Sequence, residues 1–144
     1  MNASSHIIVI KIGTNVITQD DGLLNKAILQ SIVDQVCQLK DDGRDVIIVS
    51  SGAMAAGRAQ ITPTATSDKV VTRQILSAVG QTSLMQEYLK VFADKKYVCA
   101  QLLTTKDDFR TRSHYLNMRQ CFEALLADNV VPIVNENDVI AVEE

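Results

Sequence analysis

The residues best suited to chemistry stand directly after apolar, β-branched stretches of the chain. They occur in the segments Lys11-Ile12-Gly13-Thr14-Asn15, Ser50-Ser51-Gly52-Ala53 and Asn135-Glu136-Asn137-Asp138. Each segment is rich in glycine, hydroxyl, amide or charged groups. In open parallel sheets, ligands bind outside the carboxyl ends of the strands. If the apolar stretches are parallel strands, these segments converge on one edge of the sheet and form a single site.

Lys11 is the sharpest single candidate, because it interrupts an otherwise apolar strand two residues before Gly13. A glycine lets backbone N–H groups approach a ligand closely, and a cation beside it can hold a transferring phosphoryl group. The competing interpretation is a lysine near a strand end whose ammonium reaches water while its methylenes cover apolar surface. The pattern alone leaves both interpretations open.

The segment Gly52–Ala59 nearly matches the phosphate-binding loop GxxxxGK[ST]. Arg58 stands in place of the lysine and Ala59 in place of the Mg²⁺-binding hydroxyl, so the segment is not a P-loop. What remains is a strand, a turn of small residues and a helix N-terminus, which can bind a carboxylate as well as a phosphate. Small residues are equally expected here if they only allow a helix to pack closely.

The segment Asn135–Asp138 concentrates amides and carboxylates directly after the apolar run Val130–Val134. Asn and Asp favour turns, because their side chains hydrogen-bond nearby backbone groups. The functional interpretation is that Asp138 recognises an ammonium group, with Asn135 and Asn137 offering amide contacts. The spacing does not decide between a turn and a binding site.

No metal site is expected, because His6 and His114 stand apart from any matching cluster of cysteines or carboxylates. The three cysteines, Cys37, Cys99 and Cys121, are widely spaced among apolar neighbours, and no CxxC motif occurs. We expect all three to be small buried side chains, reduced in a cytoplasmic protein.

The elements that must position these residues alternate between strands and helices. The strands are expected at His6–Ile12, Val46–Val49, Tyr97–Leu103 and Val130–Val134. The continuous apolar run of the first is typical of a strand buried on both faces. This alternation predicts an α/β domain in which helices cover both faces of a parallel sheet.

The helices are expected between these strands. Asn25 can cap the first, whose apolar residues Ile28, Ile32, Val36 and Leu39 recur every three or four positions and which would end at Gly43. A short Ala-rich helix follows Gly52, and a long one covers Lys69–Ala93, with Gly80 a kink or a point of close packing. Thr104–Arg112 is expected to be a loop. After it, Ser113 can cap a helix whose apolar face carries Tyr115, Met118, Phe122 and Leu125.

Composition excludes several classes of function. The 144 residues are 47% hydrophobic with a net charge of −3, and a domain of this size can bury roughly 70% of the surface of its unfolded chain. No cluster of Lys or Arg forms a stripe for a nucleic-acid backbone. The apolar run near the start is short and interrupted by Lys11, which suits neither a secretory signal nor a membrane span of about 20 apolar residues.

Taken in order, these segments resemble the glutamate 5-kinase family, a branch of the amino acid kinases. Their combination favours this branch over the N-acetylglutamate, carbamate, aspartate and uridylate kinases. The matching stretches cover nearly the whole chain and are VIKIGTNVIT (Val9–Thr18), VIIVSSGAMAAGR (Val46–Arg58), SAVGQTSLMQEY (Ser77–Tyr88), QLLTTKDDFRTRSHYLN (Gln101–Asn117) and VVPIVNENDVIA (Val130–Ala141).

The resemblance implies a three-layer αβα sandwich with a mainly parallel sheet, in which a lobe for glutamate precedes a lobe for ATP. It implies ATP-dependent phosphorylation of the γ-carboxylate of L-glutamate to γ-glutamyl phosphate, the first step of proline biosynthesis, with Mg²⁺ supplied as Mg-ATP. It also implies a cytoplasmic homo-oligomer, a dimer or a tetramer, that proline inhibits as feedback effector. Neither nucleic acid nor a membrane is expected as a partner.

The resemblance assigns the roles of the family's functional residues to the matching positions of this chain. The resemblance implies that Lys11 contacts the phosphates and stabilises the transition state, with Gly13 and Thr14 forming the adjoining phosphate loop. Ser51 would hold the substrate, with Gly52 donating a backbone N–H group to it.

On the same grounds, Asp138 would bind glutamate with Asn135 beside it, and Asp108 falls in the loop that senses proline. Members of the family continue into a GDND-like segment and an ATP lobe, and many bacterial members add a C-terminal RNA-modification-type domain. We therefore interpret residues 1–144 as the N-terminal lobe, without these parts, and expect it to be inactive alone. The alternatives are another amino acid kinase, or a non-catalytic fragment that binds glutamate or proline or serves oligomerisation.

Overall fold

A computed structural model describes residues 6–141 of the chain. Strands and helices alternate along it, as the sequence predicts. The elements in chain order are β1 (Ile7–Ile12), α1 (Thr14–Ile17), α2 (Lys26–Asp41), β2 (Asp45–Ser50), α3 (Ala53–Arg58), α4 (Lys69–Asp94), β3 (Cys99–Thr104), α5 (Lys106–Arg110), α6 (Arg112–Ala127) and β4 (Val131–Glu136).

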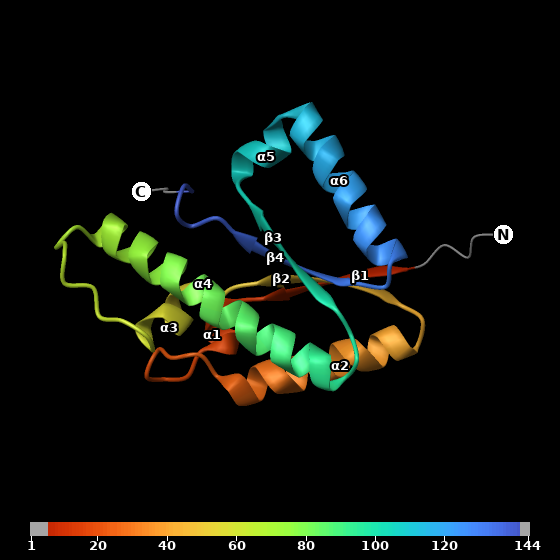
Figure 1. Cartoon of the computed structure of the whole chain (residues 1–144), viewed down its shortest axis with the longest axis horizontal. Coiled ribbons are helices and arrows are strands. Elements are labelled where there is room, and N and C mark those ends of the chain that lie inside the picture. Colours follow the sequence, from red (N-terminus) through yellow and green to blue (C-terminus); the bar gives the residue numbers. More distant parts are fainter. Residues whose placement is uncertain (1–5, 142–144) are drawn as a thin grey trace.

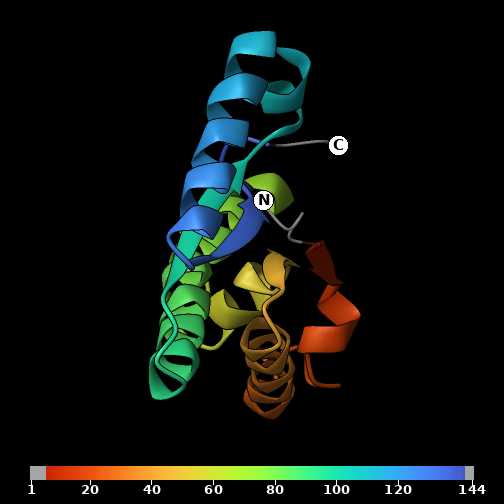
Figure 2. The ribbon, with the colours of Figure 1, turned by 90° about the vertical axis from the view of Figure 1, so that its right-hand side faces the viewer.

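The four strands form one sheet in the order β1-β2-β4-β3, and every neighbouring pair is parallel. Helices α1 to α4 lie on one face of the sheet and α5 and α6 on the other (Figures 1 and 2). The predicted α/β class, a three-layer αβα sandwich with a parallel sheet, is confirmed. Because all strands run the same way, their carboxyl ends meet at one edge.

Helix α2 begins and ends as its sequence predicts, although its buried face is rotated. The Asn25 side chain accepts a hydrogen bond from the backbone N–H of Ile28 at 3.1 Å, and Gly43 adopts the left-handed conformation after the helix. The predicted face is partly wrong, because Ile28 is 38% exposed. The fully buried positions are Leu29, Val33, Val36, Cys37 and Lys40, while Ile32 and Leu39 are only partly buried against the core.

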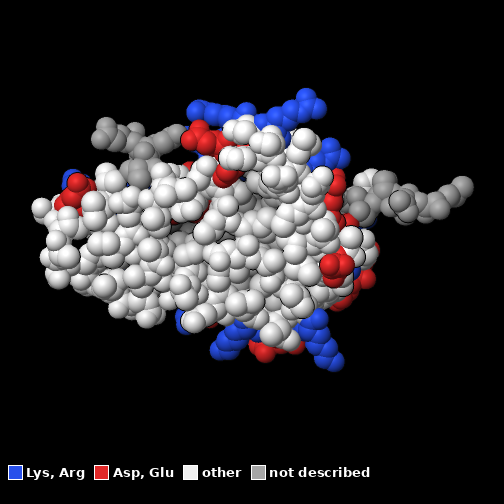
Figure 3. Space-filling view, turned by 45° about the horizontal axis from the view of Figure 1, so that its top comes forward, with Lys and Arg blue, Asp and Glu red and all other residues white. Residues whose placement is uncertain are grey.

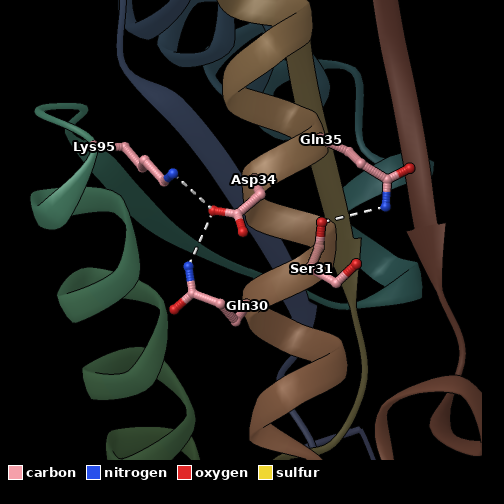
Figure 4. Close-up of polar contacts among 5 residues, drawn as sticks. All are labelled: Gln30, Ser31, Asp34, Gln35 and Lys95. Carbon is pink, nitrogen blue, oxygen red and sulfur yellow. Dashed lines mark hydrogen bonds and ion pairs between the residues drawn. The ribbon is translucent and has the colours of Figure 1, made fainter.

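Helices α2 and α4 are joined at the surface by an ion pair. Lys95, directly after α4, lies 3.2 Å from the carboxylate of Asp34, which also accepts a hydrogen bond from Gln30 at 3.0 Å (Figure 4). The hydrogen bond from Gln30, together with the Lys95 ammonium, lowers the pKa of Asp34. Both side chains are largely exposed, so the pair contributes little to the stability of the fold.

Helices α3 and α4 approach until their backbones touch. A Cβ atom added at Gly80 would lie 1.6 Å from the carbonyl oxygen of Ala53, and one added at Gly57 would lie 2.0 Å from that of Leu76. Helix α4 runs unbroken through Gly80. This glycine is therefore a point of close packing and not a kink.

The segment predicted to be the loop Thr104–Arg112 contains the short helix α5. A capping box explains it: the backbone N–H of Thr105 donates to the Asp108 carboxylate at 2.7 Å, and the Thr105 side chain accepts from the helix in return. Helix α6 follows with Thr111 at its N-cap position. The prediction that Ser113 caps this helix is therefore wrong.

Strand β1 and helix α6 are less buried than the sequence predicts. Strand β1 is an edge strand whose Ile7 and Val9 are 52% and 60% exposed, so it is not buried on both faces. Helix α6, which packs against β4, buries none of its residues fully, and Tyr115 is 46% exposed. Cys37 and Cys99 are buried as predicted, whereas Cys121 on α6 is exposed.

Candidate functional site

A cleft of about 380 Å³ opens at the carboxyl ends of β1, β2 and β4. It collects most of the residues that sequence analysis places in one site. Those that line it are Lys11, Thr14, Ser51, Gly52, Asn135 and Asp138. The strand register explains the grouping, because Lys11 lies beside Val49 of β2, and Val49 lies beside Val134 of β4.

Lys11 reaches the cleft from the exposed side of β1. Among the residues that the structure describes, it has no ion-pair or hydrogen-bond partner, so its ammonium is available to an anion. Gly13 caps α1 with an ordinary backbone conformation, and a Cβ atom added to it would meet nothing within 4 Å. The backbone after β1 is therefore open to a ligand.

The turn after β2 is held in place by contacts with β1, α1 and α4. The backbone N–H of Ser51 donates to the carbonyl of Ile12 at 3.0 Å. Gly52 has φ of 103°, and a Cβ atom there would lie 3.0 Å from the Ile17 side chain, so glycine is required for its conformation and for space. Ser50, buried beneath the turn, hydrogen-bonds the Tyr88 hydroxyl of α4 at 2.8 Å.

Asn135 is part of β4 and does not follow it, and its carboxamide has a fixed orientation. Its Nδ2 donates to Oε1 of Gln81 on α4 at 3.1 Å, and its Oδ1 accepts from the backbone N–H of Glu136 at 2.9 Å. Asn135 is 7% exposed. Within residues 6–141, the Nε2 group of Gln81 is buried without a hydrogen-bond partner. One donor beside Asn135 is therefore left for another group.

Asp138 lies in the turn that its segment favours, and its half-buried side chain lines the cleft. The carbonyl of Asn137 accepts hydrogen bonds from Ile140 and Ala141 at 3.1 and 2.8 Å, which closes the turn. The backbone N–H of Asn137 is anchored on Thr104 of β3 at 2.9 Å. The turn and the approach of Asp138 to the cleft occur together, so neither interpretation excludes the other.

Asp108 does not line this cleft. Its carboxylate caps α5 and lies 3.5 Å from Nδ1 of His114, and the backbone hydrogen bond from Thr105 lowers its pKa. It lines a separate hollow between β3 and α6, together with residues such as Leu102 and Met118. Its contacts are those of a helix-capping residue.

Further residues of the cleft were not singled out from the sequence. Arg58, noted only for its mismatch to a P-loop, lines the cleft, as do Arg73 of α4 and Glu136 of β4. Gln81 supports the cleft through Asn135. The Gln81 position falls in the AVGQ stretch that carries the family resemblance, which is the one signal that pointed towards it. Arg73 reaches the site only through the packing of α4.

Other kinds of site have little support in the described part of the chain. Between residues 6 and 141, His, Cys, Asp and Glu side chains nowhere gather in threes as a metal site requires. None of the described helices combines the length and the apolar character needed to cross a membrane. Figure 3 shows a broad face almost free of charged side chains, with Lys, Arg, Asp and Glu at its margins, so this face carries no basic stripe.

Comparisons with known proteins show similarity along nearly the whole chain. The model of the amino acid kinase family matches residues 6–144. The chain is 52% identical over 137 residues to a glutamate 5-kinase of Chlorobaculum tepidum, covering 95% of this chain and 38% of the relative. It is 44% identical to that of Bacteroides thetaiotaomicron, with the same coverage. It is 42% identical over all 144 residues to that of Aliivibrio fischeri, covering 39% of the relative.

Proposed function

The chain belongs to the amino acid kinase family, and on that premise we propose that residues 1–144 form the N-terminal, glutamate-binding lobe of a glutamate 5-kinase. The observation that carries the proposal is the single cleft into which strands β1, β2 and β4 bring Lys11, Ser51 and Asp138. The chain spans less than two fifths of its relatives, at 38% of the Chlorobaculum tepidum protein. Activity is therefore assigned to the longer protein, and these residues alone are inactive.

The reaction is phosphorylation of the γ-carboxylate of L-glutamate by ATP, which supplies the first step of proline biosynthesis. An oxygen of the γ-carboxylate attacks the γ-phosphorus in line, a new P–O bond forms, and the bond to ADP breaks. A glutamate side chain ionises at about pH 4.3, so the nucleophile needs no general base at neutral pH. The protein must bring two anions together and neutralise the charge that develops between them.

The cleft offers groups suited to those tasks. Lys11 is placed to stabilise the transferring phosphoryl group, with Gly13 and Thr14 beside it. Ser51 and the backbone N–H of Gly52 hold the substrate. These assignments are supported by the ammonium of Lys11, which is unpaired within residues 6–141, and by the open space beside Gly13.

At the β4 side of the cleft, Asp138 recognises the α-ammonium group of glutamate, and Asn135 lies beside it. Asp138 is half-buried, which strengthens a charge-assisted hydrogen bond relative to one at an open surface. The carboxamide of Asn135, whose orientation is fixed by Gln81, supports a ligand at this end.

The residues present fit a phosphate better than a metal ion. Over the described range, no set of three or more metal-binding side chains comes together. Mg²⁺ is assigned to the ATP phosphates, whose charge it shields. The nucleotide lobe is assigned to sequence that the relatives carry beyond the matched segment.

The remaining assignments follow the resemblance to the glutamate 5-kinase family. The protein acts in the cytoplasm as a homo-oligomer, a dimer or a tetramer, and proline inhibits it through the loop that carries Asp108. Because the Asp108 carboxylate is already bonded to Thr105, its contribution to proline sensing is the conformation of that loop.

The proposal is tested in a chimaera in which these 144 residues replace the matching segment of the Chlorobaculum tepidum enzyme. Glutamate-dependent ADP release is expected from the chimaera and not from the 144 residues alone. Lys11→Ala should lower kcat by about 10²–10³, because one preorganised charge-stabilising group is lost, and should raise the glutamate KM by a much smaller factor. Lys90→Ala, exposed on α4, is the matched control. A Lys11→Ala chimaera with near-normal kcat would return Lys11 to a structural role.

The assignment of Asp138 is tested in the same chimaera. Asp138→Asn should raise the glutamate KM by about 10- to 100-fold, the range expected for a lost charge-assisted hydrogen bond. The ATP KM should stay nearly constant. Asn is an equally good turn residue, so an unchanged glutamate KM would assign Asp138 to the turn alone.

A further inference from the structure

Arg73 and Asp138 border the same two cavities from different elements. Arg73 lies in the second turn of α4, and Asp138 lies in the turn after β4. Both line the main cleft, and both line a small hollow of about 30 Å³ that adjoins it. A cation and an anion thus face one continuous space at the end of the cleft nearest α4.

These two charges are held near each other without neutralising one another. Within residues 6–141, no hydrogen bond or ion pair is formed by the guanidinium of Arg73 or by the carboxylate of Asp138. The two segments that carry them are nevertheless joined by a hydrogen bond, since the side-chain Nε2 of Gln74 on α4 donates to the backbone carbonyl of Val139 at 2.7 Å. The spacing is therefore set by the fold, and both side chains remain available to a ligand.

An α-amino acid complements such a pair, because its ammonium and its carboxylate leave the same carbon atom. A polyphosphate does not, since Asp138 and Glu136 would repel it at this end of the cleft. The planar guanidinium of arginine matches a carboxylate with two parallel hydrogen bonds. Lys11 lies in the same cleft, borders no part of the small hollow, and is left for the second acidic group of the ligand.

From this arrangement we propose that Arg73 binds the α-carboxylate of the substrate and makes the site specific for an α-amino acid that also carries a side-chain carboxylate. The assignment rests on the proposed function and deepens it. Three charges then match glutamate in order: Asp138 takes the α-ammonium, Arg73 the α-carboxylate, and Lys11 faces the γ-carboxylate and the phosphoryl group. Arg58, which lines the main cleft but not the small hollow, has no part in this recognition.

Ligands that lack one charge each separate these roles. 4-Aminobutyrate is glutamate without its α-carboxylate, and glutarate is glutamate without its ammonium. The 144-residue chain, labelled with ¹⁵N, is titrated with each ligand while its amide NMR spectrum is recorded, which reports folding and binding together. Wild type should bind glutamate more tightly than either analogue.

Arg73→Gln should weaken glutamate binding by about 10- to 100-fold, as for loss of a hydrogen-bonded charge pair, and should leave 4-aminobutyrate binding unchanged. Arg73→Lys should lose part of the affinity, because the charge stays and the paired hydrogen bonds do not. Asp138→Asn should show the converse pattern, with weaker glutamate binding and unchanged glutarate binding. Lys69→Gln, on the first turn of the same helix and outside both cavities, controls for net charge.

The outcomes distinguish the two proposals. If wild type binds glutamate and Arg73→Gln binds it equally well, the role of Arg73 is overturned and the glutamate lobe stands. The role of Arg73 is likewise overturned if Arg73→Gln weakens glutamate and 4-aminobutyrate alike, or if Arg58→Gln gives the same selective loss. If wild type binds none of the ligands, both the assignment of Arg73 and the assignment of this lobe to glutamate fail.

Discussion

The helices on the two faces of the sheet differ in how firmly they are packed. On one face, α4 buries Leu84, Tyr88 and Phe92 completely, and its backbone touches that of α3. On the other face, α6 has no fully buried residue, and Leu116 is 41% exposed. The same sheet therefore has a well-buried hydrophobic layer on one face and a less buried layer on the other.

This difference shows that the layer containing α4, and not the layer containing α6, supports the cleft. Arg73 and Gln81 come from α4, and Tyr88 of α4 holds Ser50 under the turn that carries Ser51. The less buried layer contributes Asp108, which lies outside the cleft. Rigid support is thus concentrated where a ligand would need several groups held at fixed spacing.

The largest effect is expected where α3 and α4 touch. Gly80→Ala removes a glycine from a helix interior, which alone would stabilise by about 1 kcal/mol. The added Cβ atom, 1.6 Å from the carbonyl oxygen of Ala53, instead forces the helices apart, and overpacking of this severity should cost more than about 3 kcal/mol. Urea unfolding followed by circular dichroism measures the loss.

Gly13→Ala is the control for that substitution, because its Cβ atom meets nothing within 4 Å. Its stability should stay within about 0.5 kcal/mol of wild type. A Gly80→Ala protein as stable as wild type would show that α3 can move away from α4 at little cost, and the contrast between the layers would lose its main support.

A second, smaller effect compares leucines of the two layers. Leu84 is fully buried on α4, and Leu116 is 41% exposed on α6. Leu84→Ala should destabilise the chain by about 2–5 kcal/mol through lost contacts and a cavity, whereas Leu116→Ala should change stability by about 0.5 kcal/mol or less. Equal losses from the two changes in urea unfolding would mean that α6 is covered in solution, for instance by another copy of the chain.

Features set by local chemistry were predicted well from the sequence. The strands, the Asn25 cap and the turn at Gly43 depend on neighbouring residues only. The convergence of Lys11 and Asp138 also followed, since it needs only that the strands be parallel. Helix α5 was not predicted, although Thr105 and Asp108, three positions later, match the capping-box pattern.

Features set by packing over long distances were not predicted. The burial of α2 depends on where α4 lies, so the periodic pattern gave a face one residue away from the true one, with Leu29 in place of Ile28. Arg73 joins the cleft only because the α3–α4 contact brings its helix there. The exposure of Val9 and Cys121 reflects an incomplete outer layer, which composition does not reveal.

The smallest effect concerns the proton on Tyr88, which the packed layer encloses. Burial raises the pKa of Tyr88 to about 12, while an unfolded tyrosine ionises at about pH 10. The unfolded chain therefore loses this proton first, so the stability present below about pH 10 falls as the pH rises to about 12, by at most about 2–3 kcal/mol. Tyr88→Phe should lose about 1 kcal/mol at neutral pH with the hydrogen bond to Ser50, and should then decline less steeply above about pH 10. Urea midpoints across this range measure both effects.

Burial similarly raises the pKa of Cys99, to about 11, so part of the decline remains in the variant. Tyr115→Phe, at 46% exposure on α6, is the matched control and should follow wild type. A Tyr88→Phe protein with the wild-type alkaline slope would show that water reaches this hydroxyl, and hence that the layer beneath the cleft is more open than its packing indicates.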